Sequence, residues 1–215
     1  MKREKGLFIT LEGGEGSGKS TVSRMLKEWL EERGESVVLT REPGGTETAE
    51  MIRELILKRE MDPLTEAFLF AAARNEHVNE VIVPALEEGK IVISDRYIDS
   101  SFVYQGIVEG LGVEKVYEIN RPMLERATPD ITFLLDVSPS TSEYRVKNRL
   151  SGSIDRFDRA GIEFFEKVRK GYYEVKRIPE VKERMCLIPQ RVLRAEDVTE
   201  WIVRCLKERF PERFG

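Results

Sequence analysis

The sequence predicts an α/β fold in which a five-stranded parallel sheet is flanked by helices on both faces. Two observations support this prediction. Short apolar runs rich in β-branched residues alternate along the chain with longer segments in which apolar residues recur at helical spacing. The apolar runs are also nearly continuous, as in strands buried on both faces of a parallel sheet. Ligands of such sheets bind beyond the carboxyl ends of the strands.

Each strand is predicted from one of the apolar runs. The first run reads Leu-Phe-Ile-Thr-Leu, and the third, which we expect to be fully buried, reads Ile-Val-Ile-Ser. The predicted strands are residues 7–11, 36–40, 91–94, 131–137 and 185–188. Polar signatures directly follow the first three strands, so we expect them to converge on one crevice.

The first helix is predicted from its apolar face. Val22, Leu26 and Leu30 recur at helical spacing, and Gly34 ends the helix. Further helices are predicted at residues 47–58, 64–88 with an interruption at Pro84, 116–126, 140–149, 162–177 and 196–209. Within the helix predicted at residues 64–88, Phe68 and Leu69 are expected to be core residues.

Composition indicates one globular domain, residues 1–215, in a cytoplasmic protein. The chain is 40% hydrophobic and carries a net charge of −4, with lysine and arginine scattered rather than clustered. We therefore expect no nucleic-acid partner. Residues 1–6 are charged and no apolar run reaches the ~20 residues that span a bilayer, so we expect neither a signal peptide nor a membrane role. Cys186 and Cys205 are expected to be reduced, buried thiols.

A phosphate-binding loop follows the first predicted strand. Residues 13–20 match G-x-x-x-x-G-K-[ST] and lead into a helix, which is the context that this motif requires. Backbone N–H groups and the helix N-terminus then face phosphate oxygens. Lys19 is expected to reach the β- and γ-phosphates of a nucleoside triphosphate, and Ser20 to ligate Mg²⁺. The predicted phosphate-binding residues are Gly13, Gly14, Glu15, Gly16, Ser17, Gly18, Lys19, Ser20 and Thr21.

The loop alone is shared by switches, motors and small-molecule kinases. A GTPase would need a guanine-reading N-K-x-D motif, which the sequence lacks. A motor or transporter ATPase would normally be longer. A small kinase is the interpretation that remains.

Two further signatures resemble those of thymidylate kinases. Residues 41–46 read Arg-Glu-Pro-Gly-Gly-Thr, and residues 95–106 read Asp-Arg-Tyr-Ile-Asp-Ser-Ser-Phe-Val-Tyr-Gln-Gly. The stretches 68–70 and 129–137 fit the same family, and the resemblance extends over about residues 8–173. It implies a P-loop kinase fold, phosphoryl transfer from ATP to dTMP for dTTP synthesis, Mg²⁺ as cofactor and a homodimer.

The resemblance also implies which residues bind dTMP. Phe70 and Arg74 share one helix face, where a ring can stack on a pyrimidine beside a guanidinium donor. From the residues alone, core packing for Phe70 and a surface position for Arg74 remain open. Arg96 offers a planar fork that suits a monophosphate. The predicted dTMP-binding residues are Glu15, Arg41, Pro43, Phe70, Arg74, Arg96, Ser101, Tyr104 and Gln105. Among them, Glu15 is implied to contact the sugar 3′-hydroxyl and Tyr104 to exclude ribonucleotides.

Ser20 and Asp95 are the predicted Mg²⁺ site. Asp95 closes an apolar run in the manner of a Walker-B aspartate, and the resemblance favours it. Asp136, at the end of the next strand, remains the rival candidate.

A lid is predicted at about residues 145–159, where basic residues flank a Gly/Ser patch. Gly16 stands where some relatives carry a loop arginine, so the charge-neutralising arginines are expected in the lid. A monophosphate oxygen is largely deprotonated at neutral pH and needs no general base. The predicted catalytic residues are Lys19, Glu15, Arg96, Arg145, Arg149 and Arg156.

Three points remain open. His77, the only histidine, is expected to have a surface or helix-packing role rather than a chemical one. Residues 188–192 diverge from the family pattern, which leaves the contacts to the donor base undefined. Another nucleoside monophosphate kinase, specific for pyrimidines or guanine, and a non-catalytic P-loop nucleotide-binding protein are the alternative functions.

Overall fold

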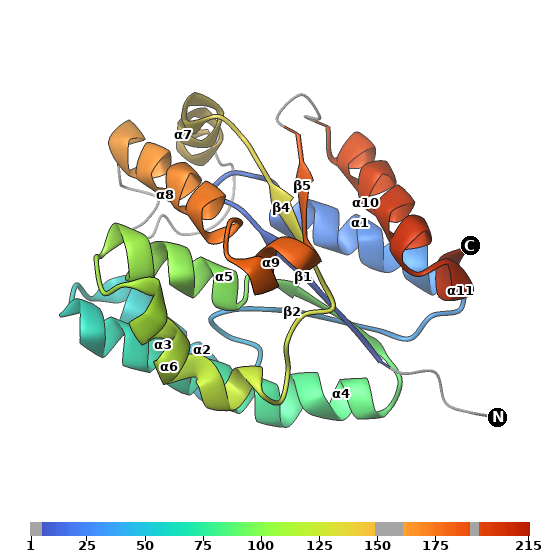
Figure 1. The fold of residues 1–215 in the computed structure, drawn as a ribbon, viewed down its shortest axis with the longest axis horizontal. Helices are drawn as coiled ribbons and strands as arrows, with labels where there is room; N and C mark the ends of the chain where they lie inside the picture. Colours follow the sequence, from blue (N-terminus) through green and yellow to red (C-terminus); the bar gives the residue numbers. More distant parts are fainter. Residues whose placement is uncertain (1–5, 149–160, 190–193) are drawn as a thin grey trace.

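The sheet has five strands, all parallel, in the order β2-β3-β1-β4-β5 (Figure 1). The computed structural model describes residues 6–148, 161–189 and 194–215. The strands are β1 (Leu7–Glu12), β2 (Val37–Arg41), β3 (Ile91–Asp95), β4 (Ile131–Leu135) and β5 (Met185–Ile188). The predicted fold class is therefore confirmed. In most of the strands, the predicted ends differ from the observed ones by one or two residues.

Helices cover both faces of this sheet (Figure 1). The α-helices of the described residues are α1 (Lys19–Glu31), α2 (Glu47–Lys58), α3 (Pro63–His77), α4 (Val83–Glu87), α5 (Ile98–Ser101), α6 (Val113–Leu124), α7 (Pro139–Lys147), α8 (Ile162–Val175), α9 (Pro179–Arg184), α10 (Ala195–Arg209) and α11 (Pro211–Phe214). Two π-helical segments, η1 (Val78–Ile82) and η2 (Phe102–Val108), join α3 to α4 and extend α5.

Alternate residues of the central strand serve two separate hydrophobic cores. Phe8 of β1 packs in one core with residues of α3, α6, α8 and η2. Its neighbours Leu7 and Ile9 pack in the other core with residues of α1, α10 and α11. Successive side chains of a strand point to opposite faces, so a nearly continuous apolar run is required to fill both cores.

The helix around residues 98–108 was not predicted. Its first turn, α5, passes into the π-helical η2, whose wider turn does not follow the 3.6-residue spacing sought in the sequence. Pro84 does not interrupt the helical stretch from residue 63 to residue 87. It lies in the first turn of α4, directly after η1, and the wider π-helical turn before it accommodates a residue that has no N–H to donate.

Two smaller expectations also need correction. Cys186 and Cys205 are free thiols, as expected, but each is half-buried rather than buried. The short helices α9 and α11 were missed because each is too brief to show a period. Within the described residues, no helix has both the length and the apolar composition needed to cross a membrane.

Candidate active site

The carboxyl ends of β1, β3 and β2 lie side by side. The strand register pairs Leu11 with Asp95, and Asp95 with Arg41. The three polar signatures that follow these strands therefore converge, as the parallel sheet predicts. Between them is a crevice of about 670 Å³.

The phosphate loop forms one wall of this crevice. Gly18, with φ of +96°, caps the N-terminus of α1 in a conformation that favours glycine. Lys19 is buried, and its Nζ donates to the carbonyls of Gly13 (2.9 Å) and Gly14 (3.0 Å). Burial, together with the nearby Arg96, lowers the pKa of Lys19 to about 8. The loop thus presents a poorly solvated cation at a helix N-terminus, an arrangement suited to a polyphosphate.

All nine residues predicted to bind dTMP line the crevice. They are Glu15, Arg41, Pro43, Phe70, Arg74, Arg96, Ser101, Tyr104 and Gln105. Among the described residues, two buried oxygens here lack a hydrogen-bond partner, Glu15 Oε2 and Gln105 Oε1. Buried polar atoms are rarely left without partners, so both are suited to receive donors from a ligand.

Arg96 is the most connected cation of the crevice. Its NH2 donates to Glu15 Oε1 at 3.0 Å, and its NH1 donates to Gly13 O and Ser100 Oγ, both at 3.0 Å. Tyr104 donates its hydroxyl to the same Glu15 oxygen at 2.6 Å. Arg96 has φ of +73°, an unfavourable conformation for a residue with a side chain, and it is kept there by these contacts.

Ser20 and Asp95, the predicted metal pair, are brought together. Ser20 Oγ donates to Asp95 Oδ2 at 2.6 Å, and both residues line the crevice. A hydroxyl and a carboxylate oxygen are hard ligands of the kind that Mg²⁺ prefers, so these residues fit the ion.

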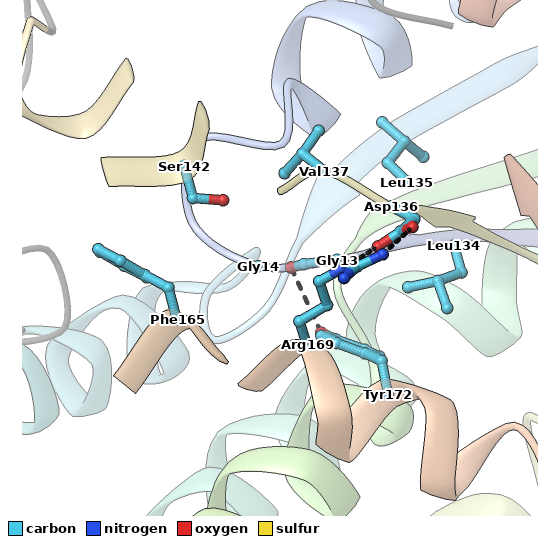
Figure 2. Close-up of a pocket in the computed structure, with 10 residues that line it drawn as sticks. All are labelled: Gly13, Gly14, Leu134, Leu135, Asp136, Val137, Ser142, Phe165, Arg169 and Tyr172. Carbon is cyan, nitrogen blue, oxygen red and sulfur yellow. Dashed lines mark hydrogen bonds and ion pairs between the residues drawn. The ribbon is translucent and has the colours of Figure 1, made fainter. Parts of the chain in front are cut away.

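Asp136, the rival metal candidate, is engaged elsewhere. It forms a bidentate ion pair with Arg169 at 2.6 and 2.9 Å, and Tyr173 donates to it at 2.8 Å. The pair borders a cavity of about 20 Å³ behind Gly13 and Gly14, large enough for about one water (Figure 2). This geometry favours Asp95 over Asp136 as the metal ligand.

Arg74 occupies neither a surface position nor an apolar one. Its side chain is only 2% exposed, and its guanidinium donates to Glu42 (2.8 Å), Asn120 (2.6 Å) and Ser101 (3.0 Å). Phe70, one turn before it, lies half-buried on the same side of α3 and lines the crevice with it. The surface alternative for Arg74 is therefore wrong.

Phe68 was predicted to be a core residue and is instead 56% exposed. Helix α3 buries the face that carries Ala67, Ala71 and Arg74, and Phe68 lies outside that face. The local run Phe-Leu-Phe did not reveal which ring points outward.

His77 has a packing role, one of the two non-chemical roles expected, and not a surface one. It is fully buried, with Nδ1 3.0 Å from Glu42 Oε1 and Nε2 2.6 Å from Thr40 Oγ1. Glu42 thus contacts both Arg74 and His77, which joins α3 to the loop after β2.

Arg145 is the one predicted lid arginine within the described residues; Arg149 and Arg156 lie outside them. Its NH1 donates to Gly16 O at 3.1 Å. It borders both the crevice and a second pocket of about 270 Å³, lined also by Thr21, Val137 and Ile188. A Cβ on Gly16 would lie 3.2 Å from the Cβ of Arg145, so α7 occupies the space beside the loop that a side chain would need.

One basic residue of the crevice was not foreseen. Arg53 of α2 lines it, and its NH1 donates to Pro43 O at 2.8 Å. Arg41, the residue predicted at this point, is 55% exposed and paired with Glu50 at 3.0 Å. Arg53 shares a face of α2 with Leu57, another crevice residue, but none of the predicted site residues lies on α2, so the sequence offered no signal for it.

Comparison with known proteins gives a consistent result. The family model described as "Thymidylate kinase" matches residues 11–200. A curated thymidylate kinase from Bacillus cytotoxicus is 40% identical, over 95% of this chain and 99% of that protein. One from Caldicellulosiruptor saccharolyticus is 43% identical, over 97% of this chain and all of that protein. The crystal structure of thymidylate kinase from Ehrlichia chaffeensis superposes with a TM-score of 0.75 at 34% identity, covering 94% of this chain and 99% of that one.

Proposed function

The chain belongs to the thymidylate kinase family, and we propose that it transfers the terminal phosphoryl group of ATP to dTMP, giving ADP and dTDP for dTTP synthesis. The observation that carries this proposal is the shared crevice. A phosphate-binding loop and a second cation, Arg96, line it together. Two phosphate-binding groups at one site are what a phosphoryl transfer between two nucleotides needs.

We propose that ATP binds along the phosphate loop. Lys19 would exchange its contacts with the carbonyls of Gly13 and Gly14 for the β- and γ-phosphates. The pocket of about 270 Å³ beside the loop adjoins Ile188 and the start of α10, and it is our candidate for the donor base.

We propose that dTMP fills the opposite half of the crevice. Arg96, with Arg41 and the newly identified Arg53, would bind its phosphate, because a guanidinium suits a phosphate dianion. Phe70 would stack on the thymine beside Arg74. The unpartnered Glu15 Oε2 would accept the 3′-hydroxyl, and Tyr104 would restrict the 2′ position.

We propose Mg²⁺ as the cofactor, held by Ser20 directly and by Asp95 through water. When bound, the ion would supply positive charge that offsets the charge of the phosphates. Chelation with excess EDTA should abolish ADP release, and added Mg²⁺ should restore it. Full turnover after chelation would contradict the cofactor proposal.

The remaining charge is assigned to cationic side chains. Arg145 is placed between the crevice and the second pocket, next to where the transferred group would lie. A dTMP phosphate has its second pKa near ~6, so its oxygen can attack without a general base. Catalysis would then consist of positioning and charge neutralisation.

A coupled ADP-release assay across the nucleoside monophosphates tests the function. We expect dTMP to give the highest kcat/KM, with CMP, UMP and GMP far lower, because the proposed stacking on Phe70 and the proposed restriction of the 2′ position by Tyr104 favour a deoxypyrimidine. Turnover of CMP or GMP well above that of dTMP would assign the chain to another monophosphate kinase. ATP binding without turnover of any monophosphate would make it a non-catalytic nucleotide-binding protein.

We also propose that the protein is a homodimer of the cytoplasm. Met51 and Leu55 of α2 and Phe68 of α3 are 69%, 46% and 56% exposed, although α2 and α3 pack against each other. Large apolar side chains exposed on adjacent helices are typical of an interface between subunits. The free thiols Cys186 and Cys205 fit a reducing compartment.

A further inference from the structure

The hydroxyl of Tyr172 is the meeting point of a buried polar network below the phosphate loop. Tyr172 lies on α8 and is 2% exposed. Its hydroxyl is 3.2 Å from Arg96 NH1, 2.9 Å from Ser100 Oγ, 2.9 Å from Glu12 Oε2 and 3.4 Å from Gly13 O. Figure 2 shows the side chain reaching from α8 toward Gly13. One hydroxyl therefore touches both the donor loop and the arginine assigned to the acceptor.

Glu12 completes the network from the end of β1. Its fully buried carboxylate accepts from the backbone N–H groups of Tyr97 (2.8 Å) and Ser100 (3.3 Å) and from Ser100 Oγ (2.6 Å). Helix α5 has no side-chain cap of its own. Glu12 thus supplies, from a neighbouring strand, the acceptor that an N-cap residue would normally provide.

Helix α5 and its extension η2 carry much of the predicted dTMP site. Ser101 is the last residue of α5, and Tyr104 and Gln105 follow in η2. Arg96, two residues before α5, holds its positive φ through contacts that include Tyr172 and Ser100. A group that fixes the start of α5 therefore fixes the direction of four predicted acceptor contacts.

We propose that Tyr172, acting with Glu12, is a positioning residue that orients Arg96 and the start of α5 for the monophosphate acceptor. The inference rests on the proposed function, since it assumes that Arg96 binds the acceptor phosphate. Tyr172 touches no substrate in this scheme and acts through Arg96. Removing its hydroxyl should loosen Arg96 while leaving the Lys19 side of the loop intact.

The groups around Glu12 act on its pKa in opposite directions. Burial, then the nearby Asp99, raise the pKa of Glu12 to about 7, while Ser100, Arg96 and the Tyr97 N–H oppose this. Lys19 from α1 and Arg184 from α9 also face this carboxylate. The hydrogen bond from Tyr172 favours the ionised form.

The test is Tyr172→Phe, with Tyr173→Phe as the matched control. Tyr173 is the next residue on α8, and its hydroxyl bonds to Asp136 outside this network. For Tyr172→Phe we expect kcat/KM for dTMP to fall about tenfold, the effect of losing one hydrogen bond to a charged group, with KM for ATP changed less than about twofold. Tyr173→Phe should leave kcat and both KM values within about twofold of wild type.

A double-mutant cycle with Ser100→Ala adds a readout that a general loss of stability would not change. Because Ser100 contacts Tyr172 and two of its partners, Arg96 and Glu12, the double variant should lose less activity than the product of the single losses. Equal changes in KM for ATP and dTMP, or multiplicative losses in the cycle, would overturn the proposal. Unchanged dTMP kinetics in Tyr172→Phe would also overturn the proposal. A wild-type enzyme that does not phosphorylate dTMP would instead overturn the proposed function, and this inference would fall with it. If Tyr172→Phe does not fold, Ser100→Ala alone, with the same selective loss expected, decides the question.

Discussion

Buried charges on either side of the phosphate loop have pKa values shifted toward neutrality. Burial raises the pKa of Glu12 from 4.5 to about 7 and lowers that of Lys19 from 10.5 to about 8. Both shifts reflect the cost of keeping an ionised group away from water. The stability of the folded chain should therefore depend on pH.

The first prediction concerns the pH dependence of unfolding. The folded chain binds a proton at Glu12 more tightly than the unfolded chain, so this contribution to stability is full below pH 4.5 and is lost as pH rises to about 7. Glu12→Gln lacks this titration. Its free energy of unfolding, minus that of wild type, should rise by up to about 3 kcal/mol between pH 4.5 and pH 8. Urea unfolding at several pH values measures this difference, and parallel pH curves would contradict it.

A second prediction concerns Arg96. In Arg96→Ala, dTMP affinity should fall about 100-fold or more, because a charge-assisted contact to the phosphate is removed. Affinity for a non-hydrolysable ATP analogue should change only slightly, since Lys19 keeps its place. Calorimetric titration of each ligand separates the two effects. Arg33→Ala, which alters a guanidinium stacked on Trp29 away from the crevice, is the control. Equal losses for both ligands would count against the assignment.

At the scale of elements, helix α3 is fixed to the loop after β2 by a single buried carboxylate. Glu42 pairs with Arg74 at 2.8 Å and contacts His77 at 3.0 Å, and all three side chains are at most 3% exposed. Arg74 and His77 both lie on α3, so both contacts with Glu42 form only when α3 is packed in its observed position. The placement of Phe70 and Arg74 in the crevice depends on this junction.

Replacing Glu42 should therefore destabilise the fold strongly. Glu42→Ala leaves the guanidinium of Arg74 buried without its counter-ion, at an expected cost of about 3–5 kcal/mol. Glu54→Ala removes an ion pair with Lys58 in which both side chains are 71% exposed, and should cost less than about 1 kcal/mol. Chemical denaturation of both variants provides the comparison. A similar small loss for both would show that the buried pair is not a structural anchor.

The same element scale explains which parts of the structure were predictable. The strands and α1, α2, α8 and α10 follow from hydrophobic periods that each core demands. Helix α5 with η2 could not be predicted in this way. The π-helical turn breaks the hydrophobic period, and the capping group of α5, Glu12, comes from strand β1. Tyr172 was missed for a related reason: its role depends on a contact with Glu12, 160 positions away in the sequence.

At the scale of the whole molecule, the exposed side chains Met51, Leu55 and Phe68 require an explanation. The wrong core assignment of Phe68 and the proposed homodimer have the same origin. A residue that is apolar, on a helix and 56% exposed in one chain becomes buried if a second chain covers it. The sequence indicated that the residue should be buried, but not against which chain.

The fourth mutational prediction follows from this surface. Phe68→Glu should shift the protein from dimer to monomer at micromolar concentration, because a carboxylate would be buried at the centre of the proposed interface. Sedimentation velocity measures the change. Ile162→Glu, on α8 and 42% exposed in wild type, should leave the assembly unchanged. A wild-type chain that sediments as a monomer would refute the dimer.

The contact between Arg96 and Glu15 links the two halves of the crevice energetically. Arg96 also donates to Gly13 O, so the arginine that we propose for the acceptor phosphate touches the phosphate loop twice. A ligand that moves the loop must alter these contacts. It thereby alters the affinity of the other half of the crevice for its own ligand. Thermodynamic linkage then requires reciprocity: the factor by which a bound triphosphate analogue changes the Kd of dTMP equals the factor by which dTMP changes the Kd of the analogue. The two substrates of this enzyme are in that sense each other's effectors.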